Sequence, residues 1–99
     1  METIDEIKHE LLELGFNVNS RGIMYWIEAI KYAKENPTEW ETFFLYDYIA
    51  KRYGSTERRV ERAMRVAIAP AIENIQKKYN YHGKIKTSTF LSLIRFKLS

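Results

Sequence analysis

The sequence contains no cysteine, only two prolines and four glycines, and no long apolar run. The absence of cysteine excludes a disulfide framework and a thiolate metal site, and it is typical of a reducing cytoplasm. A membrane-spanning helix needs roughly 18 consecutive apolar residues, which the chain lacks. The acidic N-terminus also lacks the apolar core of a signal peptide. We therefore expect a soluble, cytoplasmic protein.

Groups that perform catalysis are equally scarce. The two histidines, His9 and His82, stand in no metal-ligand or catalytic-triad spacing, and the chain has no glycine-rich phosphate loop. We expect no enzyme activity, no metal, no cofactor and no small-molecule substrate.

Charge is divided unevenly along the chain. Residues 1–49 carry ten acidic and four basic side chains, a balance of −6, whereas residues 50–99 carry three acidic and twelve basic ones, a balance of +9. The two halves together give the net charge of +3. This division indicates that the second half faces a polyanion, although a gradient that serves only solubility would give the same counts.

Apolar residues recur at helical spacing, which predicts an all-α chain forming a single domain over residues 1–99. We expect about six helices: 3–14, 21–35, 43–53, one that begins after a cap at Ser55 or Thr56, 70–79 and 88–98. A short helical turn is expected around residues 38–42. Gly15 is the expected stop of the first helix, and Pro37 ends the second. Pro70 should end or kink the fourth helix, or open the fifth.

Residues 43–69 predict a helix-turn-helix. Gly54 lies between the two helices and supplies a turn with positive φ. The small side chain of Ala50 lets the helices approach each other, and Val60 packs between them. Each feature is weak alone, but their spacing is typical of the motif.

The second helix of this motif has two opposite faces. Val60, Met64 and Ala67 form an apolar stripe, whereas three arginines share a stripe about 60° wide on the other side. These arginines are Arg58, Arg62 and Arg65, with Glu61 beside them.

Such a face is unfavourable in water because like charges three and four residues apart repel each other. It becomes favourable when phosphates neutralise it or when guanine O6 and N7 accept bidentate bonds from arginine. The alternative is a solvated face on which Glu57 and Glu61 pair locally with arginines.

Three segments resemble one family. Residues 21–30 read RGIMYWIEAI, residues 49–53 read IAKRY after Leu45-Tyr46, and residues 59–68 read RVERAMRVAI. They are similar to RGIxYLIEAI, LYPxIAKKY and RVERAIRHAI in the C-terminal effector domain of the stage 0 sporulation response regulators. Residues 90–98 follow the last helix of that domain more loosely, so the resemblance covers most of the chain.

The resemblance implies a six-helix fold that binds a defined duplex DNA element, in a transcription regulator related to those of sporulation initiation. It places base contacts on Glu61, Arg62 and Arg65. Backbone contacts are expected from Ser55, Thr56, Arg58, Arg59, Lys84 and Lys86. The protein would then be associated with the nucleoid, and a homodimer on DNA is compatible with this reading.

The chain departs from the family pattern at three places. Val66 stands where the pattern has histidine, Pro70 falls where the helix continues, and the loop with Lys84 and Lys86 is shorter and lacks a proline. The sequence contains no receiver domain, which fits a natural absence and a removal equally well. A module that binds and modulates another regulator, with little DNA affinity of its own, is the competing hypothesis.

Overall fold

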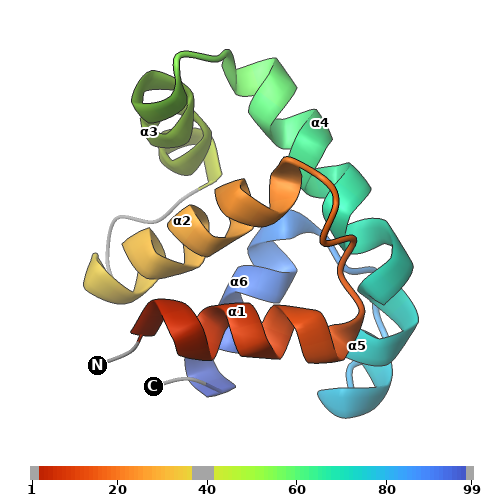
Figure 1. Cartoon of the computed structure of the whole chain (residues 1–99). Helices are drawn as coiled ribbons and strands as arrows, with labels where there is room; N and C mark the ends of the chain where they lie inside the picture. The colour runs from red at the N-terminus through yellow and green to blue at the C-terminus, as the bar shows by residue number, and fades with distance from the viewer. Residues whose placement is uncertain (1–2, 37–41, 98–99) are drawn as a thin grey trace.

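The computed structural model describes residues 3–36 and 42–97 of the chain. Its secondary structure consists of α1 (Thr3–Leu14), α2 (Gly22–Glu35), α3 (Thr42–Tyr53), α4 (Glu57–Ile68), the 3-10 turn η1 (Ala69–Ala71), α5 (Ile72–Lys78) and α6 (Thr87–Lys97) (Figure 1). The prediction of an all-α protein is confirmed, and no strand occurs in the described residues. The turn expected around residues 38–42 falls outside them, apart from Thr42, where α3 begins.

Two glycines and one threonine act as the expected stop and start signals, whereas Pro37, the expected stop of the second helix, lies outside the described residues. Gly15 follows α1 with a φ of +91°, and Gly54 follows α3 with a φ of +63°. Both values lie in the left-handed region that glycine adopts without steric cost. Thr56 is extended and caps α4, because its hydroxyl oxygen accepts a hydrogen bond from the Arg59 amide at 3.2 Å.

α4 ends at Ile68, two residues before Pro70, as the sequence predicts, but the chain stays helical around the proline. It lies in the first positions of η1, where a missing amide hydrogen costs little. α4, η1 and α5 therefore follow one another without a gap, and α5 begins at Ile72 rather than at Pro70. The expectation of six helices is corrected to five separate helical rods in the described residues, since α4 runs on through η1 into α5 along one side of the molecule (Figure 1).

α2 is the central element of the core and contacts α1, α3, α4 and α6. Its Trp26 is fully buried and lies between two other aromatic rings. The ring centroids are 5.8 Å from Phe16 and 5.3 Å from Phe90, both in edge-to-face arrangements. These rings connect the segment after α1 to α6 through α2.

The contact between α2 and α4 is unusually close. A Cβ atom added to Gly22 would lie 2.0 Å from the Ala63 carbonyl oxygen and 2.6 Å from its carbonyl carbon. One turn along α2, the Trp26 indole Nε1 donates a hydrogen bond to the Met64 carbonyl oxygen at 2.7 Å. The two contacts hold the backbone of α4 directly against α2.

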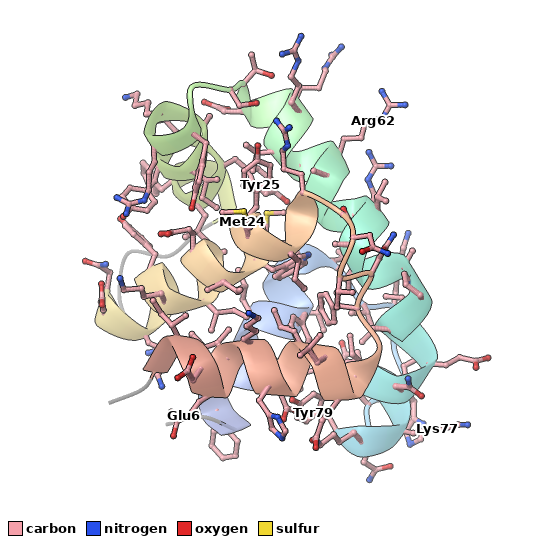
Figure 2. All side chains as sticks on the ribbon, in the orientation of Figure 1. Glu6, Met24, Tyr25, Arg62, Lys77 and Tyr79 are labelled. Atoms are coloured by element: carbon pink, nitrogen blue, oxygen red, sulfur yellow. The ribbon has the colours of Figure 1, made fainter. Side chains whose placement is uncertain are left out.

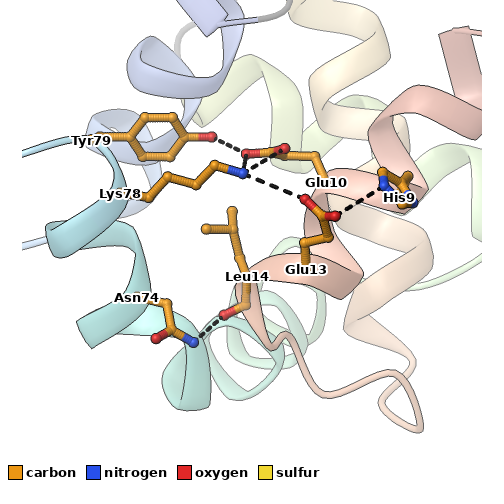
Figure 3. Close-up of polar contacts among 7 residues, drawn as sticks. All are labelled: His9, Glu10, Glu13, Leu14, Asn74, Lys78 and Tyr79. Atoms are coloured by element: carbon orange, nitrogen blue, oxygen red, sulfur yellow. Dashed lines mark hydrogen bonds and ion pairs between the residues drawn. The ribbon is translucent and has the colours of Figure 1, made fainter.

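A polar cluster joins α1 to the end of α5 (Figure 3). Glu10 is only 6% exposed, and its carboxylate accepts hydrogen bonds from the Tyr79 hydroxyl and from Lys78 Nζ, the latter at 3.2 Å. Nearby, Asn74 Nδ2 donates to the Leu14 carbonyl oxygen at 2.8 Å, which satisfies a backbone acceptor at the end of α1. Burial raises the pKa of the Tyr79 phenol, and the hydrogen bond to Glu10 raises it further.

Gly22→Ala should strongly destabilise the protein, because the new methyl group would meet the backbone of α4 rather than a flexible side chain. We expect the free energy of unfolding to fall by about 3 kcal/mol, measured by urea denaturation followed by circular dichroism. Gly54→Ala is the comparison: no atom lies within 4 Å of its added Cβ, so only backbone strain of about 1–2 kcal/mol remains. A loss at Gly22 no larger than the loss at Gly54 would contradict the steric account.

Tyr79→Phe should lower the free energy of unfolding by about 1.5–3 kcal/mol at neutral pH, because a buried carboxylate loses a hydrogen bond. The folded-state pKa of Tyr79 is raised, so its stabilisation is present below the ordinary tyrosine value of 10.0 and is lost as pH rises above it. The difference in the free energy of unfolding between the wild type and Tyr79→Phe should therefore become smaller as pH rises above 10.0. Tyr81→Phe controls for the removal of one phenol, and a constant difference across this range would contradict the assignment.

Candidate nucleic-acid interface

α4 presents one face to the core and the other to solvent. Val60, Met64 and Ala67 are fully buried, whereas Arg58, Arg62 and the other arginines of the helix are exposed. Figure 2 shows Arg62 and a series of further nitrogen-tipped side chains along α4, pointing away from the other helices. The apolar and arginine faces inferred from the sequence are therefore the buried and exposed faces of this helix.

Most of these arginines carry uncompensated charge. Among the described residues, Arg58, Arg59 and Arg62 have no ion-pair partner. Arg65 differs, because its Nε and Nη2 donate to the two carboxylate oxygens of Glu61 at 3.0 and 3.1 Å. Local pairing with acidic residues thus accounts for one of the four arginines of α4.

The turn before α4 is short and held at both ends. The Ser55 amide donates to the Ala50 carbonyl oxygen at 2.8 Å, and Ala50 is nearly fully buried beside the adjoining helix. At the end of α3, the Tyr53 hydroxyl donates to Glu28 Oε2 of α2 at 3.1 Å, and Arg52 pairs with the same oxygen at 3.4 Å. The end of α3 is therefore positioned by contacts with α2, and the turn is tied back to α3 by its own hydrogen bond.

The basic loop before α6 lies beside α4. Lys84 and Lys86 line a hollow of about 350 Å³ together with Glu61 and Arg65. Its remaining lining residues are Tyr46, Ile68, Ile85, Thr87 and Ser88. The structure thus brings four of the predicted site residues together, whereas Arg62 and Arg58 lie outside this hollow on the exposed side of α4.

Three contacts hold the loop in this place. The Tyr46 hydroxyl of α3 donates to Thr87 Oγ1 at 3.0 Å, at the first residue of α6. Gln76 of α5 donates through its side-chain Nε2 to the Gly83 carbonyl oxygen at 3.1 Å. The backbone carbonyl oxygen of Gln76 accepts a hydrogen bond from the Tyr81 amide at 2.9 Å. Burial raises the pKa of the Tyr46 phenol, although the hydrogen bond to Thr87 opposes the shift. Tyr46 therefore remains a neutral donor at physiological pH.

Sequence reasoning did not single out Tyr46, Gln76 or Thr87 as parts of the site. Their roles depend on distances across the fold, since 41 residues separate the two ends of the Tyr46–Thr87 hydrogen bond. No local spacing indicates such a pair.

The described residues offer little that would support other kinds of site. No group of three or more metal-ligating side chains occurs among residues 3–36 and 42–97. No helix in this part of the chain is both long and apolar enough to cross a membrane.

Residues 7–98 match the family described as Sporulation initiation factor Spo0A C terminal. The chain belongs to this family. The Spo0A C-terminal domain is a DNA-binding effector domain of a sporulation regulator, and the family is one of regulatory domains rather than of enzymes. The resemblance seen in the RGIMYWIEAI and RVERAMRVAI segments is thereby confirmed over nearly the whole chain.

Proposed function

We propose that this chain is a sequence-specific, duplex DNA-binding domain of a transcription regulator related to those of sporulation initiation. α3 and α4 act as the two helices of a helix-turn-helix, and α4 enters the major groove. The observation that carries the proposal is the exposed side of α4, where Arg58, Arg59 and Arg62 lack ion-pair partners among the described residues.

The dimensions and polarity of α4 suit this role. Its 12 residues extend about 18 Å, and the major groove, about 12 Å wide, admits a helix of this kind. The positive end of the helix dipole lies at Thr56 and favours a phosphate there. We assign Ser55, Thr56, Arg58 and Arg59 to the sugar-phosphate backbone, where contacts fix the register of the helix in the groove.

Arg62 and Arg65 are assigned to base edges. Glu61 holds Arg65 through Nε and one hydrogen of Nη2, so the edge formed by Nη1 and the second Nη2 hydrogen remains available. That edge has the geometry for guanine O6 and N7. The Glu61 carboxylate keeps lone pairs that can accept from a cytosine N4 amino group, which retains Glu61 as a base contact.

Lys84 and Lys86 extend the positive surface to one side of α4. Because the hollow between them and Arg65 is open to a ligand, a DNA strand beside α4 would bring its phosphates to both lysines. A second copy on the same duplex is part of the proposal, and the symmetry of the preferred site will report on it. The whole chain would act as one domain on the nucleoid.

Duplex binding should weaken steeply with salt, because phosphate contacts release counterions. With four cationic side chains of one bound copy on phosphates, we expect log K for that copy to fall by about 3.6 per unit of log salt concentration. Lys84→Ala and Lys86→Ala should each reduce this slope by about 0.9 without changing the preferred sequence. Lys8→Ala, an exposed lysine of α1, is the matched control.

The measurement is selection from a random duplex pool, followed by titrations of the selected site at several salt concentrations. If no duplex is enriched, or if binding does not depend on salt, the DNA function is wrong and the protein-interaction alternative takes its place. A changed preferred sequence in either lysine variant would contradict the assignment of the loop to phosphates.

Arg62→Ala and Arg65→Ala should each relax the preference at one base pair by about 1–3 kcal/mol while the fold is retained. Because Glu61 holds Arg65, Glu61→Ala should also relax the preference at the base pair that Arg65 contacts. The combined loss of binding free energy in the Glu61→Ala/Arg65→Ala double variant should be smaller than the sum of the two single losses. For Arg62→Ala and Arg65→Ala, the losses of binding free energy should add in the double variant. The test measures the affinity of each protein variant for duplexes that differ from the selected site at one base pair. If an arginine variant loses affinity equally for all these duplexes, that arginine contacts a phosphate and not a base.

A further inference from the structure

One apolar side chain interrupts the charged side of α4. Val66 is 52% exposed, whereas Val60, Met64 and Ile68, the other large apolar residues of the helix, are buried. An exposed valine by itself carries no functional meaning, and valine is a weaker helix former than alanine or arginine. Its position among the arginines gives it significance.

Val66 lies one helical turn after Arg62 and directly follows Arg65. Residues four apart are neighbours on a helix surface, with Cβ atoms about 6 Å apart. At 100° per residue, Val66 lies about 40° from Arg62, on the side away from Arg65. It does not line the hollow beside Lys84 and Lys86, so the basic loop leaves it uncovered.

In the major groove, the apolar group that distinguishes one base from the others is the C5-methyl group of thymine. Val66 is four residues beyond Arg62 and so lies about 6 Å further along the helix axis, which is one or two base-pair steps of about 3.4 Å where the helix follows the groove. An exposed isopropyl group at this distance can cover a methyl group and exclude water from it.

We propose that Val66 reads the C5-methyl group of a thymine one or two base pairs from the guanine bound by Arg62. The proposal rests on the function proposed above and adds a specificity-determining residue to it. It predicts a thymine at a defined place in the preferred site, and it requires no hydrogen bond from Val66.

The test replaces each thymine of the selected duplex by uracil, which removes one methyl group and leaves the hydrogen-bonding groups intact. For the wild-type chain, uracil at one position should weaken binding about fourfold, the effect of one buried methyl group. Val66→Ala should make this difference smaller, because the shorter side chain covers less of the methyl group. Val18→Ala, an exposed valine in the segment before α2, should keep the fourfold difference and serves as the matched control.

Each outcome decides the matter. Three results would overturn the assignment of Val66 and leave DNA binding intact. They are a site without thymine near the guanine, uracil duplexes that all bind the wild-type chain as well as the thymine duplex, and a methyl effect that is undiminished in Val66→Ala. Failure to enrich any duplex overturns the proposed function itself. Because alanine favours the helix more than valine, loss of folding would not explain the Val66→Ala result, and circular dichroism verifies this.

Discussion

The close contact between α2 and α4 is the constraint on which the rest of the structure depends. Gly22 leaves room for the Ala63 backbone, and the Trp26 indole donates to the Met64 carbonyl oxygen. These contacts fix α4 in rotation as well as in position, so its apolar side faces the core and its arginines face solvent. A helix that rolled about its axis would bury guanidinium groups without partners, which is prohibitively costly.

Two segments that are distant in the sequence, α3 and the loop before α6, are held beside the α4 helix that this contact positions. α3 is held to α2 through Glu28 and carries Tyr46, whose hydroxyl binds Thr87 at the start of α6. The loop with Lys84 and Lys86 is thereby placed beside α4. Part of the positive charge of the second half of the sequence, that of Lys84 and Lys86, thus lies beside Arg65 of α4 through the hydrogen bonds that hold this loop.

The exposed face of α4 carries three different kinds of side chain. Arg65 is oriented by Glu61, Arg62 has no ion-pair partner in the described residues, and Val66 adds an apolar group next to them. Charge alone would favour any polyanion, whereas a mixture of oriented donors and a methyl-sized apolar group can distinguish base pairs. This mixture is the reason for proposing sequence-specific binding rather than general affinity for nucleic acid.

The sequence by itself determined the helices, their glycine and threonine boundaries, and the two faces of α4, because periodicity and capping act over a few residues. It also indicated the family, which the match over residues 7–98 confirms. The sequence further indicated that the fourth helix ends near Pro70, and α4 does end at Ile68; the 3-10 turn that continues the helical rod into α5 was not predicted. Only the tertiary structure decided which arginine of α4 pairs with a carboxylate. It also decided that Glu61 and Arg65 face Lys84 and Lys86 and that Tyr46 holds their loop, because those contacts join residues that no local pattern relates.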